Sequence, residues 1–164
     1  MEPGAGTDKI WSDFTDRVTA TIGELEPGEY LVLVAPPNRY VQVSVQDFAI
    51  RVESVSDQYL HPGSGLDADQ VRELRRLGFD PPSHPAEVDA EKSEGSSNWW
   101  LELETTATQE QVAGLLVEAL RRVHRVGDPK VLTYDCGAVV EGHIPQPRLR
   151  LPRTRSPEET ARWN

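Results

Sequence analysis

Hydrophobic residues recur at helical spacing near both ends of the first 135 residues. The first run places five apolar side chains on one helical face, with Trp11 beside it: Ile10, Phe14, Val18, Ile22 and Leu25. The second run follows Thr108, a predicted N-cap with Gln111 at the capping-box position. Its apolar members are Val112, Leu115, Leu116, Ala119, Leu120 and Val123. Both stretches are therefore predicted to be amphipathic helices.

Strand patterns fill much of the chain between these helices. Residues 30–34 form a continuous apolar run, which is typical of a central strand buried on both faces. Apolar and polar residues alternate in residues 40–45 and again in 48–52, so we expect two half-buried antiparallel strands. Residues 99–104 alternate too, with Trp99 on the apolar side and Trp100 on the polar side. Residues 131–134 fit a short fifth strand.

A short helix is predicted between the third and fourth strands. Asp67 opens it, and Gln70 stands three residues later as the reciprocal capping partner. Gly78 stands where a left-handed residue ends a helix, and Phe79 can then fold back onto Leu74 in a Schellman arrangement. Two prolines at 81–82 prevent continuation.

These elements predict an α+β fold in a single domain. Its order is an N-terminal helix, an antiparallel three-strand meander, a short helix, a further strand or strands, and a long C-terminal helix packed on the sheet. We expect a flexible N-terminus over residues 1–7, a folded domain over 8–136, and a disordered tail rich in proline and arginine over 137–164. The polar, acidic residues 83–97 are expected to form a mobile loop.

Charge and composition narrow the choice of partners. The formal net charge is −10, and residues 137–164 carry +2, so the predicted folded part carries −12. An acidic body repels phosphate backbones, which argues against nucleic acid as a partner. No apolar run approaches 18 residues, so we expect no membrane insertion. A single cysteine, Cys136, excludes an internal disulfide framework, and a cytoplasmic protein is the simplest expectation.

Candidate chemistry is sparse. The four histidines, at 61, 84, 124 and 143, lack metal-ligand spacing and are interpreted as surface residues, and Cys136 as an inert thiol. We therefore expect no metal and no cofactor. Glu102 and Glu104 share one strand face and could perform acid–base chemistry if they were buried together. A solvated strand face is the favoured interpretation of this pair.

Three short motifs, taken together, resemble a known family. They are the run of residues 51–60 (Arg-Val-Glu-Ser-Val-Ser-Asp-Gln-Tyr-Leu), the run of residues 74–82 (Leu-Arg-Arg-Leu-Gly-Phe-Asp-Pro-Pro), and the pair Asn98-Trp99. In this order they resemble the actinobacterial TY-chaperone group, which is related to type III secretion chaperones and YbjN-like proteins. The resemblance spans about residues 8–135, with Phe79 where a tryptophan is expected. It implies a type III secretion chaperone-like fold that binds peptides or protein clients, with a possible homodimer and no catalytic residues.

The sequence therefore favours a non-catalytic, chaperone-like module that holds a peptide or protein client. The predicted partner-binding residues are Trp100, Tyr40, Glu102 and Glu104, because large aromatics on a strand's outer face are good anchors. The first helix or the tail could instead cover Trp100. Two alternatives remain open: a dedicated accessory subunit of a secretion or defence complex, and an enzyme that uses Glu102 and Glu104.

Overall fold

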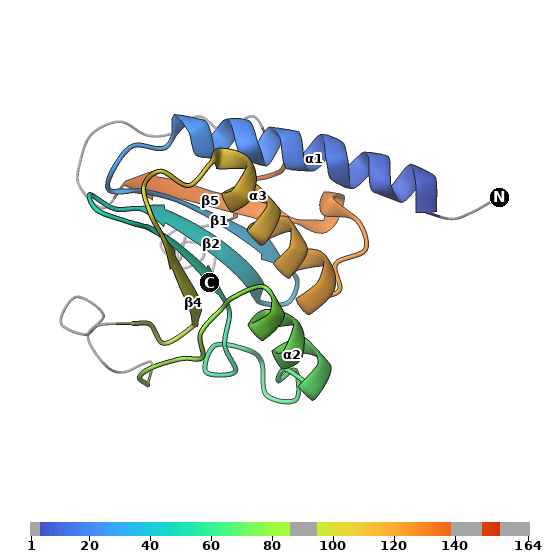
Figure 1. Ribbon diagram of the computed structural model, residues 1–164. Helices are drawn as coiled ribbons and strands as arrows, with labels where there is room; N and C mark the ends of the chain where they lie inside the picture. The colour runs from blue at the N-terminus through green and yellow to red at the C-terminus, as the bar shows by residue number, and fades with distance from the viewer. Residues whose placement is uncertain (1–3, 86–94, 139–148, 155–164) are drawn as a thin grey trace, which may run out of the picture.

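A five-stranded antiparallel sheet with helices packed on one face forms the protein (Figure 1). The computed structural model describes residues 4–85, 95–138 and 149–154. The elements in chain order are α1 (Gly4–Glu24), β1 (Glu29–Ala35), β2 (Arg39–Val45), β3 (Ile50–Ser54), α2 (Ala68–Arg76), β4 (Trp99–Leu103), α3 (Gln109–Glu118), the π-helix η1 (Ala119–Val123), the 3-10 helix η2 (Pro129–Val131) and β5 (Thr133–Ala138). The strand order is β4-β3-β2-β1-β5. This is the α+β fold that the sequence predicts.

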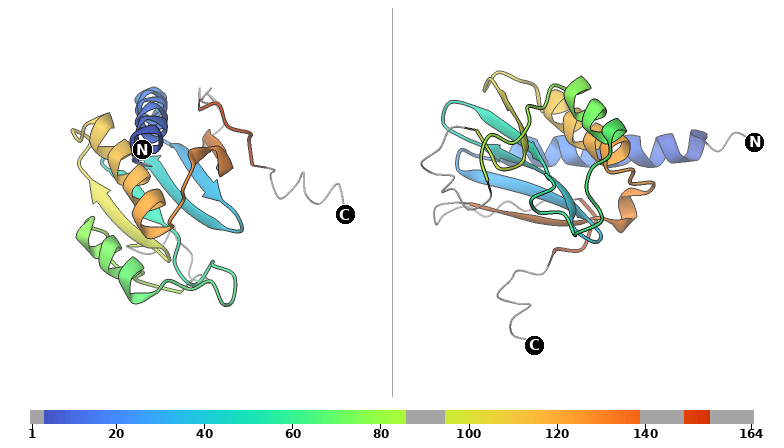
Figure 2. Two further views of the ribbon diagram at one scale, coloured as in Figure 1. Left: turned by 90° about the vertical axis from the view of Figure 1, so that its right-hand side faces the viewer. Right: turned by 90° about the horizontal axis from the view of Figure 1, so that it is seen from below.

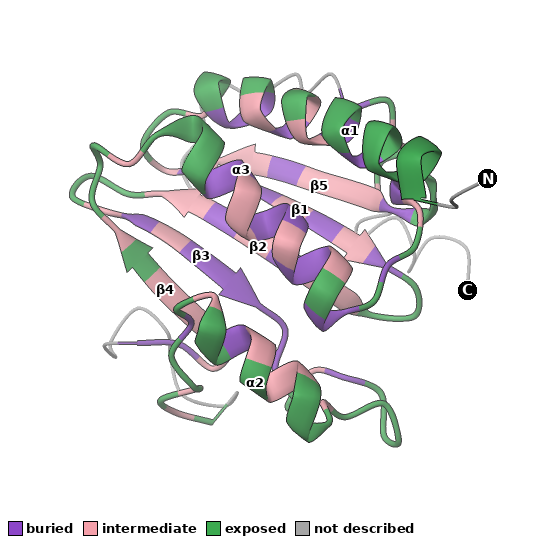
Figure 3. Ribbon diagram, turned by 45° about the vertical axis from the view of Figure 1, so that its right-hand side comes forward, coloured by how far each residue is buried: buried purple, intermediate pink, exposed green. Residues whose placement is uncertain are grey.

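The core lies between the sheet and the pair α1 and α3, which pack against each other (Figure 3). Residues of β1 alternate between buried and half-buried, so every second side chain of this strand faces the helices. In β1 the core members are Leu31 and Leu33, whereas Tyr30, Val32 and Val34 on the other face are only half-buried. The expectation that this strand is buried on both faces was therefore wrong, because helices cover one face only.

Helix α1 begins earlier than the sequence pattern indicates. It starts at Gly4, so residues 4–7, expected to be flexible, form the first turn of the helix. Its buried stripe runs through Trp11, Phe14, Val18 and Ile22, whereas Ile10 is 39% exposed. Gly4 and Gly6 have low helix propensity, which hid this start from the sequence analysis.

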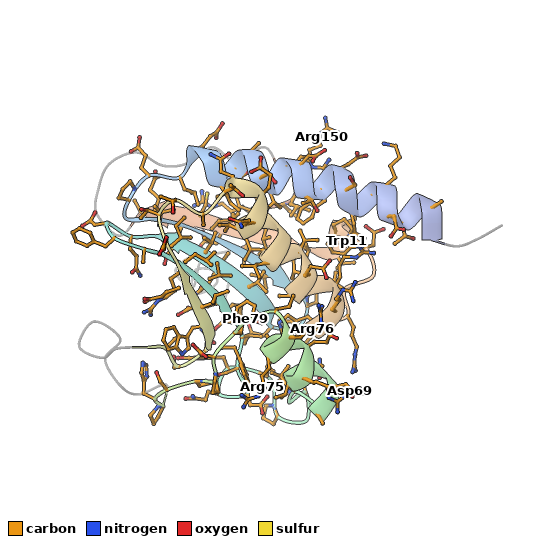
Figure 4. All side chains as sticks on the ribbon, viewed as in Figure 1. Trp11, Asp69, Arg75, Arg76, Phe79 and Arg150 are labelled. Carbon is orange, nitrogen blue, oxygen red and sulfur yellow. The ribbon has the colours of Figure 1, made fainter. Side chains whose placement is uncertain are left out.

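The local signals for α2 and α3 are confirmed. The Asp67 and Thr108 side chains each accept a hydrogen bond from the N3 amide, and their own backbone amides donate the reciprocal bond to the N3 glutamine side chain, as a capping box requires. Gly78 has φ +99°, and the Phe79 amide donates to the Leu74 carbonyl at 3.0 Å. This is the predicted Schellman ending, and Phe79 reaches the core from the end of α2 (Figure 4).

Two strands have limits that differ from the prediction. Strand β3 begins at Ile50, and Phe48 lies in the preceding turn with 93% of its surface exposed. Strand β5 runs over residues 133–138 and not 131–134, because Pro129 starts a 3-10 turn that occupies residues 129–131. Residues 137–138, assigned to the tail, therefore pair with β1.

His124 is buried and does not lie on the surface as expected. It ends the π-turn of η1, where its amide donates to the Ala119 carbonyl at 3.0 Å. Its side chain is 1% exposed, and Nε2 lies 2.8 Å from Ser54 Oγ. The Arg39 guanidinium donates to the His124 carbonyl. This histidine thus joins the C-terminal helix to β2 and β3.

Part of the predicted tail also belongs to the fold. Residues 149–154 lie along β5, and Figure 2 shows this segment in red beside the orange strand. Leu149 is 1% exposed and Leu151 packs against the core. The expectation of disorder over 137–164 was therefore wrong for these six residues, because two leucines in an otherwise polar stretch reach the core. Residues 139–148 and 155–164 lie outside the described part of the chain.

Candidate functional site

An apolar groove of about 490 Å³ opens between α3, the end of α2 and the inner face of β4. Its lining residues are Leu77, Leu101, Leu103, Gln111, Gly114, Leu115 and Glu118. Leu101 and Leu103 form its floor, and Leu77 stands at the C-cap of α2. Pockets of this size and apolar character commonly hold ligands in proteins.

Gly114 sets the width of the groove on its α3 side. The residue lies within a helix whose neighbouring positions 112, 113, 116 and 117 face the core. A Cβ atom added at Gly114 would meet no atom within 4 Å. Leu115 is only partly buried, so it presents apolar surface toward the groove. A missing side chain at Gly114 thus leaves open space next to Leu115.

Strand β4 is an edge strand whose hydrogen-bonding groups are used at one end. The Trp100 amide donates to the Asp80 carbonyl at 3.1 Å, and the Asp80 amide donates to the Trp100 carbonyl at 2.8 Å. Both backbone groups of Trp100 therefore point away from β3. Those of Glu102 point the same way, because the direction repeats every second residue. Among the described residues, the backbone of Glu102 has no partner on that side.

Carboxylates surround this edge. Glu102 and Glu104 are exposed, and Glu118 lines the groove. Glu102 Oε1 lies 2.6 Å from an Arg51 nitrogen, and Glu118 pairs with Arg122 at 2.5 Å. Glu104 lies one residue beyond the end of β4, where it accepts a hydrogen bond from Thr106 at 3.4 Å. The two glutamates are therefore solvated and not buried together, which is the favoured sequence interpretation.

The two tryptophans of β4 face opposite ways, as their alternation indicates. Trp99 is buried in the core, and the Arg75 guanidinium lies 5.5 Å from its ring centre. Trp100 is half-buried on the outer face, where Nε1 donates to the Pro81 carbonyl at 3.2 Å and Arg51 lies 5.6 Å from the ring centre. Neither α1 nor the tail supplies these contacts. Trp100 is thus a partly open aromatic on the strand beside the groove.

Tyr40 lies further inside the sheet, on β2. Its hydroxyl donates to Asn98 Oδ1 at 3.2 Å. Burial raises the pKa of this phenol to about 12. The same Asn98 oxygen also accepts from the Ser56 amide at 3.2 Å. The Tyr40 hydroxyl is therefore already engaged in holding Asn98, the residue before β4, to the sheet.

Comparison with family models matches residues 4–138 to TY-Chap3, described as "T3SS (YopN, CesT) and YbjN peptide-binding chaperone 3". The chain belongs to this family. The match covers α1 through β5 and stops before residues 149–154. Comparison with curated proteins and with solved structures gave no match. The motifs at residues 51–60, 74–82 and 98–99 therefore indicated the right group.

The groove of this TY-Chap3 domain is not apparent from the sequence pattern. Leu77, Leu103 and Leu115 look like ordinary core positions, because their spacing matches that of fully buried neighbours. One signal was present: Gly114 interrupts the helical pattern, where a glycine costs about 1 kcal/mol relative to alanine. Of the four predicted partner-binding residues, three lie at or beside β4 and the fourth, Tyr40, does not.

The described part of the chain offers little other chemistry. Across residues 4–85, 95–138 and 149–154, no three His, Cys, Asp or Glu side chains gather in a way that could hold a metal ion. Cys136 is buried, and burial raises the pKa of its thiol. No helix in these ranges is long and apolar enough to span a membrane.

Proposed function

We propose that this protein is a non-catalytic peptide-binding module that holds an extended client segment along β4. The observation that carries this proposal is the free backbone edge at Glu102, which runs beside the apolar groove. An added strand gains main-chain hydrogen bonds at such an edge, and pockets for alternate side chains supply selectivity. The family description, a peptide-binding chaperone, supports the same use.

The pleat determines which client side chains reach which surface. A strand placed beside β4 directs every second side chain to the helical face, next to Leu101 and Leu103 in the groove. The intervening side chains lie on the outer face near Trp100, Glu102 and Glu104. The client segment is therefore expected to alternate apolar and basic residues. Tyr40 has no part in this site.

Filling the groove tests the proposal most directly. Gly114→Trp should fill the open space beside Leu115, because a Cβ at this position meets no atom within 4 Å. The probe is a labelled peptide Lys-Leu-Lys-Leu-Lys-Leu, with Glu-Leu-Glu-Leu-Glu-Leu as its charge-reversed control. We expect fluorescence anisotropy to show binding of the basic peptide, weakened at high salt and lost in Gly114→Trp. Gly114→Ala should bind normally and unfold at about 1 kcal/mol higher free energy, because alanine is the better helix former.

The open edge is tested separately at Glu102. Proline lacks the backbone N–H but is tolerated at an edge position whose N–H faces solvent. Glu102→Pro should therefore keep the fold and weaken peptide binding about 10-fold or more. Glu102→Ala removes the same carboxylate and keeps the N–H, so it should weaken binding much less. Equal effects of these two substitutions would exclude strand addition at β4.

The range of clients distinguishes a general chaperone from a dedicated subunit. Affinity capture from the source cell, with wild type and Gly114→Trp side by side, should give several proteins that depend on the groove. A single stoichiometric partner would instead favour the accessory subunit of a fixed complex. The exposed Glu102 and Glu104 do not favour an enzyme, because neither is buried with a reacting partner.

A further inference from the structure

The second sheet edge, at β5, is occupied by a piece of the same chain. Residues 149–154 run beside it, and Arg153 pairs with Tyr134 in parallel orientation. The Tyr134 amide donates to the Pro152 carbonyl at 3.2 Å, and the Thr154 amide donates to the Tyr134 carbonyl at 2.7 Å. The Thr133 and Thr154 hydroxyls lie 2.6 Å apart. This is the geometry of a bound peptide that extends a sheet.

Side chains anchor the segment at both ends. Leu149 is buried to 1% exposure among core residues, and Leu151 packs partly against the same core. Arg153 donates to the Cys136 carbonyl at 2.9 Å and lies 3.5 Å from Asp135. The anchors thus comprise one fully buried leucine, one half-buried leucine and one exposed arginine.

Residues 149–154 leave part of their binding site unfilled. A pocket of about 200 Å³ remains beside Leu151, between α1 and η2. It is lined by Ile10, Phe14, Arg17, Pro129, Lys130, Arg150 and Leu151. Figure 4 labels Arg150 beside α1, and the pocket lining places it with Ile10, Phe14 and Arg17 of that helix. A leucine therefore occupies a place where a larger side chain would fit.

The charge of the segment also suits this pocket poorly. Arg150 joins Arg17 and Lys130 in the lining, which brings three cations to one small space. Within the described residues, the buried Nε of Arg17 has no hydrogen-bond partner. Arg150 also has φ +58°, which is unfavourable for a residue with a side chain. An acidic residue at this place would offer Arg17 and Lys130 a partner of opposite charge.

We propose that residues 149–154 are an internal ligand in a second peptide site at the β5 edge. A partner displaces them with an extended segment that has leucine at the Leu149 place, an acidic residue at the Arg150 place and an aromatic residue at the Leu151 place. The site is built by α1, η2 and β5, all within the residues that match the family, whereas its occupant lies outside them. It is separate from the groove at β4 and prefers the opposite charge.

Tethering determines how such a site behaves. A ligand on a short linker competes at an effective concentration of the order of millimolar. External peptides therefore bind the intact chain far more weakly than a chain whose internal ligand is disabled. An external peptide that makes better contacts than the tail at the Arg150 and Leu151 positions should recover part of the affinity that it loses to the internal ligand.

The test uses the full chain and labelled peptides. Leu149→Ser with Leu151→Ser disables the internal ligand. The probes are Leu-Glu-Phe-Pro-Arg-Thr, the tail copy Leu-Arg-Leu-Pro-Arg-Thr, and Ser-Glu-Ser-Pro-Arg-Thr as control. We expect the first probe to bind the double variant at least 10-fold more tightly than wild type, and about 10-fold more tightly than the tail copy. A folded double variant that binds no better than wild type, or that ranks the tail copy first, overturns the proposal.

Two further measurements separate the two peptide sites and cover the case of an unfolded variant. Each titration is repeated with Gly114→Trp added, so binding at β5 is separated from binding at β4 and each proposal can fail alone. Hydrogen exchange on the unmodified chain covers the case in which the double variant unfolds. The Thr154 amide should exchange faster than that of Leu33 in β1, and faster again with about 1 mM of the first probe. A Thr154 amide as slow as Leu33 and indifferent to the probe would make the segment an integral part of the fold and overturn the proposal.

Discussion

The imidazole of His124 and the hydroxyl of Ser54 share a buried hydrogen bond of 2.8 Å that links the C-terminal helix to β3. Within the described residues, the other ring nitrogen, Nδ1, is buried without a partner. Burial, and secondarily the charge of Arg39, lowers the pKa of this histidine from 6.5 to about 4. The folded protein therefore holds His124 neutral across most of the acidic range.

This pKa gives a stability prediction with a definite sign. The unfolded chain protonates His124 near pH 6.5, whereas the folded chain resists protonation down to about pH 4. The unfolded state thus binds more protons between these values. The contribution is fully present above pH 6.5 and is lost as the pH falls toward 4, by about 3 kcal/mol in total. Urea melts from pH 4.5 to 7.5 should show a smaller slope for His124→Gln than for wild type.

The matched control for that series is His61→Gln, since His61 is exposed. Its stability should follow the wild-type pH profile. Carboxylates contribute to acid destabilisation in all three proteins, so only the difference between profiles reports on His124. Parallel profiles for wild type and His124→Gln would contradict the assignment.

Gly78 is predicted to be required for its backbone conformation. Its φ of +99° is strained for any residue with a Cβ, and the nearest atoms to such a Cβ are the Leu101 methyls at 4.0 Å, an ordinary contact. Gly78→Val should therefore lower the free energy of unfolding by about 1–3 kcal/mol through strain and not through a clash. Chemical melts measure this loss. An unchanged midpoint would mean that α2 ends in another way.

The two tryptophans of β4 should differ in their effect on stability. Trp99→Ala removes a core side chain and should lower the free energy of unfolding by about 3–5 kcal/mol. Trp100→Ala loses the hydrogen bond to Pro81 and the contact with Arg51 on a half-buried face. It should lower that free energy by only about 1–2 kcal/mol and weaken capture of the basic peptide. The reverse order of stabilities would show the register of β4 to be wrong.

A chain that ends at residue 138 should be measurably less stable than the full chain. It loses the burial of Leu149, which contributes about 1.5–3 kcal/mol. The thermal midpoint should fall by roughly 4–10 °C, given the usual dependence for a domain of this size. Ending the chain at residue 154 serves as the control and should leave the midpoint unchanged. Equal midpoints for the 138-residue and full-length chains would show that the segment adds nothing.

Local signals in the sequence predicted most of the helices and strands. The capping boxes at Asp67 and Thr108 and the glycine stop at Gly78 each act within a few residues. The opposite faces of Trp99 and Trp100 follow from the pleat alone. Features of this kind are readable because their physical cause lies in adjacent residues.

Features that depend on residues far apart in the sequence could not be predicted. The partner of His124, Ser54, stands 70 positions away, so a lone histidine on a helix gave no sign of burial. Leu149 and Leu151 lack any periodic pattern, and their seat combines α1 with β5 from opposite ends of the chain. The groove arises where α2 and α3 stand apart over β4, which no single segment specifies.

The bridge between Asp80 and Trp100 limits where a client strand can pair with β4. Since Asp80 already uses the outward backbone groups of Trp100, a strand that docks on β4 has to stop before that point. It pairs at Glu102 and extends no further than the Glu104 amide, because the Glu104 carbonyl already accepts a hydrogen bond from the Ala107 amide at 2.9 Å. The bridge thus fixes one end of the segment of β4 that a client can pair with. Sliding by two residues would lose hydrogen bonds, and sliding by one would turn the client's apolar side chains to the outer face. Such an edge therefore selects the register of the client strand as well as its composition.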